Sequence, residues 1–449
     1  MNDVIVVGAG LAGLTAALTL TKAGRAVHVF EALPHLGGRT ASWTENGMEV
    51  EAGLHRFRGF YKHLPQLMRT AGIDLSRALI WVDEIEIRVP DGPSAVYGAS
   101  LPRNPRATLA TILGRNQLCR ISERLALATF FTIGAVRYGL AHARLDEVSV
   151  HALAKTCGVS QRAIDRILQA ATQSTYFHSP DRYSAYVLFS LGTKFALRPH
   201  RSGVAVFAGG MTEILADPIA DCIRQHGGTI TAGVPVQALI CDGDRVSRIK
   251  VASQEYEAKE VILATSLGRA KQLVLEAFGQ TSWNKQLLDL PTMPAVGLQI
   301  ELDAPATAVD RPTFAPGTCI AAIAEQSRTT FRKSKGRVSI LLAEPEQFLS
   351  MPPEKILSTV CADAQRVGIE LEDKIRAWRL FVSPDDFYFP YPGSEALRPA
   401  QRTPVRGLTL AGDYTKQPYM ATMEGAVLSG KIAADLVLNR TEFPGQTYQ

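Results

Sequence analysis

Hydrophobic residues form strand-like and helix-like runs in turn at both ends of the chain, and the middle is more helical. Residues 4–7 (VIVV) are β-branched and uncharged, which predicts a buried parallel strand. Good helix formers follow at 11–23, and residues 26–30 predict a second strand. Later strands are predicted at 229–230, 235–237, 261–265 and 408–411, and later helices at 212–226 and 423–438. This order predicts an α/β fold.

The turn after the first strand is rich in glycine. Gly8, Gly10 and Gly13 form the spacing GxGxxG. The first glycine of such a turn permits a tight bend, the second lets the backbone approach a pyrophosphate, and the third lets the helix pack on the strand. Glu31 follows the second strand, 18 residues beyond Gly13, where a carboxylate can accept hydrogen bonds from ribose hydroxyls. The sequence therefore predicts a dinucleotide site, with a glycine-rich turn that binds nothing as the alternative.

A second glycine pair follows Glu31. Gly37 and Gly38 precede Arg39 and Thr40. Flexible backbone followed by a guanidinium can pass close to a phosphate and clamp it. An arginine beside a dinucleotide could also bind a 2′-phosphate, but the carboxylate of Glu31 disfavours a further anion there.

GxGxxG, then an acid, then GGR resembles the FAD site of the amine oxidase and carotenoid desaturase superfamily. The resemblance implies FAD, held by a Rossmann-like domain of the GR2 type that is assembled from discontinuous segments. It also implies a glycine-containing segment beside the flavin, which is matched here by Gly53, Leu54 and His55. The strands that contain Val236 and Ala264 are expected near the dinucleotide on the same grounds. His55 is either a flavin neighbour or a hydrogen-bonded structural histidine.

A second motif lies near the C-terminus. The strand at 408–411 leads to Gly412 and Asp413, and a helix begins at Met423. An aspartate beside a helix start can hydrogen-bond flavin ribityl or pyrophosphate groups, and the positive helix end would face the flavin pyrimidine. A strand–turn–helix with a surface aspartate is the alternative. Together the motifs and the family resemblance predict these cofactor-binding residues: Gly8, Ala9, Gly10, Leu11, Ala12, Gly13, Glu31, Ala32, Gly37, Gly38, Arg39, Thr40, Gly53, Leu54, His55, Val236, Ala264, Gly412, Asp413, Met423 and Ala426.

The C-terminal segment narrows the resemblance. Residues 392–395 (PGSE), 397–404 (LRPAQRTP) and 410–417 (LAGDYTKQ) look like the plant and cyanobacterial type of phytoene desaturase and ζ-carotene desaturase. The N-terminal GLH segment fits as well, except that Arg56 and Arg58 stand where apolar, often aromatic, residues are expected. These two arginines could favour a substrate with an anionic or polar group.

The resemblance also predicts how the chain is divided. It implies one FAD domain from residues 1–60, 203–268 and 395–449. An inserted substrate domain, with a mixed sheet and helices that face a membrane, is expected from residues 61–202 and 269–394. The middle of the chain matches the family only loosely, so the resemblance covers the FAD domain better than the substrate domain.

The activity implied by the resemblance is FAD-dependent desaturation of a long isoprenoid of the phytoene or carotene type, by hydride transfer to flavin N5. The same fold could serve an isoprenoid isomerase, a hydroxysqualene-type dehydroxylase or an amine oxidase, and a prenyl-lipid carrier is the alternative without catalysis. No catalytic residue is assigned. The candidates for a substrate channel, with plain core packing as the alternative for the aromatic ones, are His55, Arg56, Arg58, Phe387, Tyr388 and Tyr391.

Charge is concentrated in one segment. Residues 101–145 contain seven arginines and one acid, Glu123, a local net charge of +6 in a chain of net charge +5. Within them, residues 125–136 are apolar and lie between Arg124 and Arg137. Twelve helical residues span about 18 Å, too short to cross a bilayer but suited to shallow insertion into an anionic leaflet. A membrane contact is therefore predicted, with a membrane quinone or oxygen as electron acceptor; a buried core helix is the alternative.

Composition adds limits. The 449 residues suffice for two or three subdomains. Six cysteines are scattered without a CxxC pair, which favours reduced thiols in the cytoplasm over disulfides or a metal site. We find no secretory signal and no apolar run of 18 residues. The expectation is a cytoplasmic protein, peripherally attached to membrane, with no metal and no nucleic-acid partner.

Overall fold

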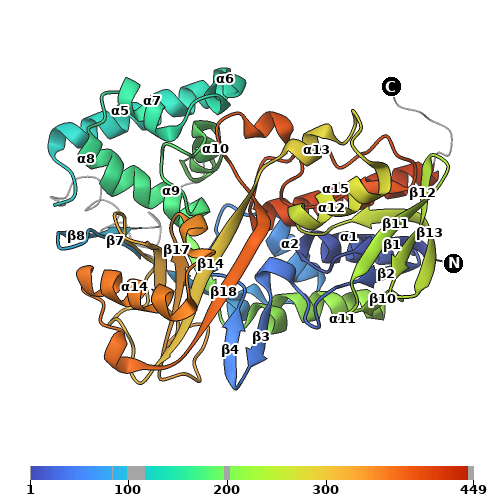
Figure 1. Cartoon of the computed structure of the whole chain (residues 1–449), viewed down its shortest axis with the longest axis horizontal. Helices are drawn as coiled ribbons and strands as arrows, with labels where there is room; N and C mark the ends of the chain where they lie inside the picture. Colours follow the sequence, from blue (N-terminus) through green and yellow to red (C-terminus); the bar gives the residue numbers. More distant parts are fainter. Residues whose placement is uncertain (1, 83, 99–116, 197–202, 443–449) are drawn as a thin grey trace.

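Two large sheets and a helical lobe make up the part of the chain that the computed structural model describes, residues 2–82, 84–98, 117–196 and 203–442 (Figure 1). The sheet that contains the N-terminal strand lies on the right of the view, and the second sheet lies beside it on the left. The helical lobe lies above the second sheet. The α/β fold class predicted from the sequence is confirmed.

The first sheet has the strand order β10-β2-β1-β13-β12-β11, with β19 paired to β13. Its centre is parallel, and β11 and β12 extend it antiparallel. Residues 4–7 are buried in the centre, as their uncharged pattern predicts. Three distant stretches supply the strands β1 (Asn2–Val7), β2 (Val27–Phe30), β10 (Thr229–Thr231), β11 (Val236–Asp242), β12 (Arg245–Val251), β13 (Gln254–Leu263) and β19 (Leu408–Leu410).

Helices pack closely on this sheet. Helix α1 (Leu11–Lys22) contacts both α11 (Asp217–Gln225) and α15 (Met423–Glu442), and a π-helical turn, Thr212–Ala216, precedes α11. A Cβ on Gly430 would lie 2.1 Å from the carbonyl oxygen of Ala12, so α1 and α15 approach as closely as they do because residue 430 is glycine. Helix α2 (His63–Thr70) joins the same hydrophobic cluster. The domain boundary expected at residue 60 therefore falls inside a packed unit.

The second sheet is mixed, in agreement with the mixed sheet expected for the inserted part. Its order is β18-β14-β17-β16-β15-β7-β8, and only the pair β15–β7 is parallel among its described strands. Helix α14 (Pro353–Arg366) packs on its apolar cluster. The strands are β7 (Glu84–Arg88), β8 (Ser94–Gly98), β14 (Thr292–Leu302), β15 (Thr313–Phe314), β16 (Ile320–Glu325), β17 (Gly336–Leu342) and β18 (Ile375–Tyr388).

The helical lobe consists of α5 (Ile121–Leu140), α6 (His142–Asp146), α7 (Val150–Thr156), α8 (Gln161–Ala163), α9 (Gln169–Tyr176) and α10 (Ala185–Ala196). Smaller elements connect the three parts: β3 (Ser42–Glu45), β4 (Met48–Glu51), β5 (Phe57–Arg58), α3 (Leu75–Ala78), β6 (Leu79–Val82), β9 (Val204–Phe207), α12 (Leu267–Phe278) and α13 (Lys285–Asp289). Among the described residues, no helix has both the length and the apolar character needed to cross a membrane.

Candidate cofactor site and its surroundings

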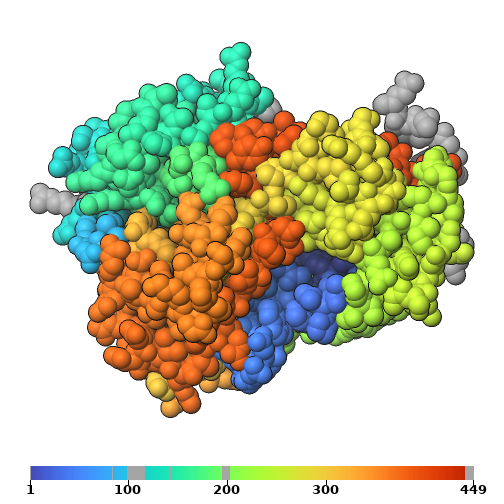
Figure 2. Space-filling model, in the orientation of Figure 1, coloured from blue at the N-terminus to red at the C-terminus, as the bar shows by residue number. Residues whose placement is uncertain are grey.

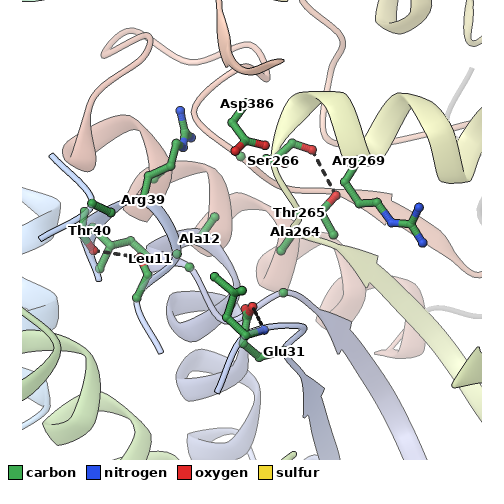
Figure 3. Close-up of a pocket in the computed structure, with 18 of the residues that line it drawn as sticks. Leu11, Ala12, Glu31, Arg39, Thr40, Ala264, Thr265, Ser266, Arg269 and Asp386 are labelled. Carbon is green, nitrogen blue, oxygen red and sulfur yellow. Dashed lines mark hydrogen bonds between the residues drawn. The ribbon is translucent and has the colours of Figure 1, made fainter. Parts of the chain in front are cut away.

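A cavity of about 450 Å³ lies at the carboxyl ends of the central strands of the first sheet (Figure 3). Its lining comes from the ends of β1, β2, β13 and β19, from the first turn of α15 and from β18. The space-filling view shows a hollow with the dark blue N-terminal residues at its floor (Figure 2). Ligands of open α/β sheets bind at this edge, so the fold alone marks the cavity as the cofactor site.

The glycine-rich turn has the geometry that a dinucleotide requires. Gly8 adopts φ +103°, and a Cβ there would lie 2.8 Å from the carbonyl oxygen of Ala264. A Cβ on Gly13 would lie 1.9 Å from the carbonyl oxygen of Gly8, so the helix packs against the turn as closely as backbone allows. Gly10 is different, because nothing lies within 4 Å of an added Cβ. Its backbone therefore borders open space in which a pyrophosphate can approach.

The first turn of α1 and Glu31 complete this end of the cavity. Gly10 caps α1 without a side-chain hydrogen bond, and Leu11 and Ala12 line the cavity. The backbone N–H of Ala9 donates to Glu31 Oε2 at 2.6 Å, and the N–H of Leu33 donates to Oε1 at 2.9 Å. Glu31 thus fixes the turn while it borders the cavity, where its remaining lone pairs can accept from a ribose.

The two predicted motifs meet in an ion pair, although 374 residues separate them. A guanidinium nitrogen of Arg39 donates to Asp413 Oδ1, and Asp386 lies close enough to interact with the same charge. Burial works against the charged guanidinium, but the two carboxylates outweigh it and raise the pKa of Arg39. The ring of Phe387 lies 4.9 Å from Cζ of Arg39. Arg39 is therefore a fixed cation in the cavity wall, already balanced by acids.

Seventeen of the 21 predicted cofactor residues line the cavity; Ala9, Gly13, Gly53 and Leu54 do not. Ala9 and Gly13 do not border the cavity but support residues that do. Ala9 does so through its hydrogen bond to Glu31, and Gly13 through the close packing of the helix on the turn. His55 lines the cavity, and a Cβ on Gly53 would lie 3.1 Å from its ring. Burial lowers the pKa of His55 to about 4, so its imidazole is neutral at physiological pH.

Sequence reasoning missed several lining residues. Arg269, in α12, donates to the carbonyl oxygen of Val236 at 2.7 Å and so fixes the strand expected near the dinucleotide. Ser266 occupies the N-cap position of α12 without a side-chain hydrogen bond, and a serine between a buried strand and a helix is the signal that could have found this corner. Asp386 belongs to β18 and borders the cavity from that strand. The missed residues include His35, Trp43, Thr265, Ser266, Arg269, Phe381, Ser383 and Asp386.

The aromatic residues proposed for a substrate channel differ in where they lie. Phe387 lines the cavity, and Tyr391 is half-buried and packs on Phe389 with ring centroids 5.8 Å apart. Tyr388 has no exposed surface, and its hydroxyl lies 2.7 Å from that of Ser394. The expectation that Tyr388 borders a channel is wrong, because successive residues of a strand point to opposite faces and Tyr388 points into the core.

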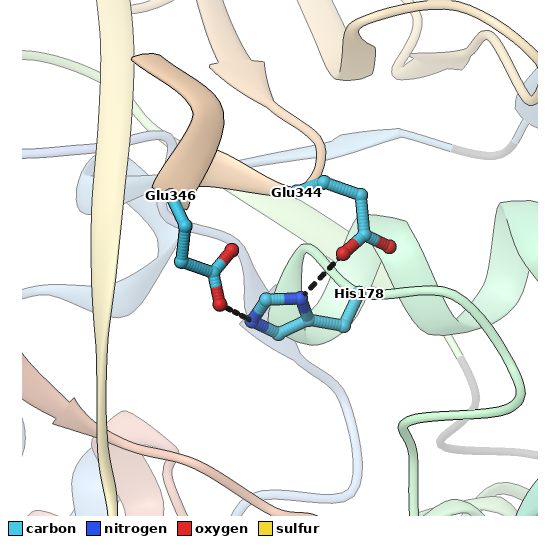
Figure 4. A group of neighbouring side chains, drawn as sticks. All are labelled: His178, Glu344 and Glu346. Carbon is cyan, nitrogen blue, oxygen red and sulfur yellow. Dashed lines mark hydrogen bonds and ion pairs between the residues drawn. The ribbon is translucent and has the colours of Figure 1, made fainter. Parts of the chain in front are cut away.

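One further cluster has the composition of a metal site. The imidazole of His178 lies between two glutamates, with Nδ1 2.9 Å from Glu344 and Nε2 3.6 Å from Glu346 (Figure 4). Arg182 already pairs with both carboxylates, at 2.9 and 2.8 Å. A cation bound there would have to displace this guanidinium, so the cluster is an ion-pair network that joins the helical lobe to the second sheet. Burial opposes ionisation of Glu344, but hydrogen bonds from His178 and Ser179 outweigh it and lower its pKa to about 2.

Comparison with known proteins agrees with this geometry. The chain is 26% identical to the 15-cis-phytoene desaturase of Synechococcus elongatus over 98% of this chain and 96% of that protein. It is 27% identical to a probable zeta-carotene desaturase of the same organism, over 97% and 98%. Among solved structures, an oxidoreductase from Methanosarcina mazei superposes with a TM-score of 0.77 at 18% identity, over 96% and 100% of the chains. A putrescine oxidase gives 0.75 at 17%, over 98% and 99%.

The family model of flavin containing amine oxidoreductases matches residues 11–438, nearly the whole chain. A flavin in a site built for a dinucleotide is FAD, which makes the protein an FAD-dependent oxidoreductase with relatives named as carotenoid desaturases. The chain belongs to the flavin containing amine oxidoreductase family.

Proposed function

We propose that the protein desaturates a long isoprenoid of the phytoene or carotene type, with FAD as the primary electron acceptor. The supporting observation is that similarity to proteins named as desaturases runs through the substrate half as well as the cofactor half, over 97–98% of the chain. The amine oxidases among the solved structures share the fold at 16–18% identity, which carries no information on substrate.

The residues around the cavity fit such a reaction. When bound, FAD supplies the acceptor for a hydride. Phe387 places an apolar ring in the wall, and His55 adds a neutral imidazole, so neither brings an ionised group to the substrate side. Oxidation of a hydrocarbon chain depends mainly on orientation and on exclusion of water. The buried setting of His55 supports both.

We also propose that α5 attaches the protein to the cytoplasmic face of a membrane, from which the substrate and a quinone acceptor would be drawn. Five of the twelve exposed large apolar side chains among the described residues lie on this helix. Four of them follow one stripe, at positions 121, 125, 136 and 140, with exposures of 78%, 66%, 53% and 83%. A contiguous stripe of exposed apolar side chains is typical of an interaction site.

The charges around α5 support the same proposal. Glu123, the one acid of segment 101–145, points inward: the Ser160 hydroxyl donates to it at 2.7 Å, and Arg162 pairs with it at 3.1 Å. Arg120 and Arg137 are exposed beside the apolar stripe. The outer surface of the helix is therefore apolar and basic, which suits an anionic leaflet. The arginines at 103, 106 and 115 lie outside the described residues.

The experiment that tests the function is anaerobic reduction of the bound flavin in liposomes. Phytoene, ζ-carotene, a squalene-type alcohol and simple amines would each be added, followed by a quinone. Bleaching of the flavin band by a carotene, and its recovery with quinone, is the expected result. Bleaching by amines alone would instead establish an amine oxidase, and bleaching by none of the isoprenoids would refute the proposal.

A further inference from the structure

Two arginines lie on one side of a short strand beside the cofactor site. Arg58 ends β5 and Arg56 directly precedes it, and side chains two residues apart along an extended chain point to the same face. Phe57 and Gly59, on the other face, border a separate surface cavity of about 570 Å³. Arg56 and Arg58 therefore lie on the side opposite Phe57, and both are half-buried.

Arg56 and Arg58 lie near residues from three parts of the molecule. His55, next in the chain to Arg56, lines the cofactor cavity. The positive charge of Arg56 is close enough to Glu51, at the end of β4, to favour its ionised form. The positive charge of Arg58 acts in the same way on Tyr183 in the helical lobe. Asp310, in the loop before β15 of the second sheet, acts on Arg56 in turn. A substrate beside the flavin would lie within this region.

Arg56 has few partners of its own. Its Nε is buried without a hydrogen bond, and its Nη1 donates to the carbonyl oxygen of His55 at 3.3 Å. Within the described ranges, no carboxylate oxygen lies within the 4.0 Å of an ion pair with Arg56. Part of its surface remains accessible, although burial is the main cause that lowers its pKa to about 10. Both observations fit a guanidinium that borders an internal space rather than bulk water.

The nearby acids do not balance this charge. Burial raises the pKa of Glu51 to about 7, so it is only partly ionised at neutral pH. Asp310 is already paired with Arg328. Arg337, a further guanidinium whose charge reaches Glu51, has no exposed surface, and its Nε and Nη1 have no hydrogen-bond partner. An incompletely paired cation inside a protein is costly unless an anion joins it.

We propose that Arg56, with Arg58 beside it, binds a carboxylate next to the flavin, so that the site also accepts isoprenoids of the phytoene or carotene type that carry a carboxylate. A guanidinium matches a carboxylate through two parallel hydrogen bonds, and the anion would supply the charge that the protein leaves missing. This inference rests on the proposed function in one respect, namely that an isoprenoid occupies the space beside His55.

The test is the binding of two probes with the same isoprenoid skeleton, retinoic acid and retinol, to the FAD-loaded full-length protein. Binding is read from the shift of the visible flavin band, without any requirement for turnover. We expect the acid to bind about tenfold or more tightly than the alcohol. In Arg56→Gln, and in the double variant with Arg58→Gln, this preference should disappear while FAD occupancy stays at the wild-type level.

Thermal unfolding of the ligand-free holoprotein separates recognition from a structural role. Removing an under-paired charge should leave Tm unchanged or raise it in Arg56→Gln. The matched control is Arg311→Gln, because Arg311 neighbours Asp310 but is paired with Glu84 at 2.9 Å; it should keep the acid preference. Equal affinity for the two probes, no binding of the acid, or loss of FAD from Arg56→Gln would each overturn the inference. Failure of the proposed function appears elsewhere, as a flavin that no isoprenoid bleaches.

Discussion

Gly10 and Gly13 belong to the same turn, yet the structure predicts opposite consequences of replacing each by alanine. In Gly13→Ala the new methyl group would lie 1.9 Å from the carbonyl oxygen of Gly8, a backbone atom that cannot turn aside. In Gly10→Ala nothing lies within 4 Å, and the backbone of Gly10, at φ −72° and ψ 176°, suits alanine. Gly13→Ala should therefore impair folding, whereas Gly10→Ala should fold and place its methyl group in the cofactor cavity.

The magnitudes follow from these contacts. The clash in Gly13→Ala should cost about 1–3 kcal/mol or more, a large fraction of a typical stability of about 5–15 kcal/mol. Gly10→Ala should change the stability of the apoprotein by about 0.5 kcal/mol at most. If its methyl group prevents one hydrogen bond from the backbone to a charged phosphate, the loss is about 1.5–3 kcal/mol of binding free energy. That corresponds to a Kd for FAD raised roughly 10- to 150-fold.

Two measurements check this prediction. Thermal unfolding of the apoproteins gives the stability, and quenching of flavin fluorescence during titration gives the Kd for FAD. Gly139→Ala is the control, because this glycine in α5 also has nothing within 4 Å of an added Cβ and lies outside the cavity lining. A Gly10→Ala protein that binds FAD as tightly as the wild type would refute the view that the backbone at residue 10 meets the pyrophosphate.

Three further predictions concern charges. Asp413→Asn should break the ion pair between Asp413 and Arg39, whose side chains are 6% and 25% exposed, respectively. The holoprotein's free energy of unfolding, measured with denaturant, should fall by about 2 kcal/mol. Glu344 has a folded-state pKa near 2, below its unfolded value, so its stabilisation is complete above about pH 4.5 and is lost as the pH falls toward 2. Unfolding measured from pH 7 to pH 3 should show a smaller loss of stability in Glu344→Gln than in the wild type; equal slopes would contradict this. Charge reversal beside the α5 stripe should weaken binding to anionic liposomes at low salt, measured by co-sedimentation. The variants are Arg120→Glu, Arg124→Glu and Arg137→Glu, and unchanged binding would exclude the membrane contact.

How much the sequence predicts depends on how far the signal extends along the chain. The turn from Gly8 to Gly13, the helix after it and Glu31 lie within one stretch, and local spacing was enough to find them. Arg269 and Asp386 reach the cavity through the packing of α12 and β18 on the cofactor half, which no local pattern records. The adjacent aromatic residues Phe387 and Tyr388 were treated alike, although a strand sends neighbours to opposite faces.

Arg39 and Arg56 differ in whether nearby carboxylates balance their charge, and this difference indicates different roles. Arg39 holds Asp413 and has Asp386 nearby, so as a unit these groups bring no net positive charge to the phosphates. Phosphate binding then falls mainly to backbone N–H groups at the start of α1, where the helix dipole and the open space at Gly10 both favour an anion. Arg56 has the reverse arrangement, a cation without a carboxylate in ion-pair range in the part of the chain that the structure describes. An arginine that is balanced by the protein positions other groups, whereas one left unbalanced beside a substrate space is suited to bind the substrate itself.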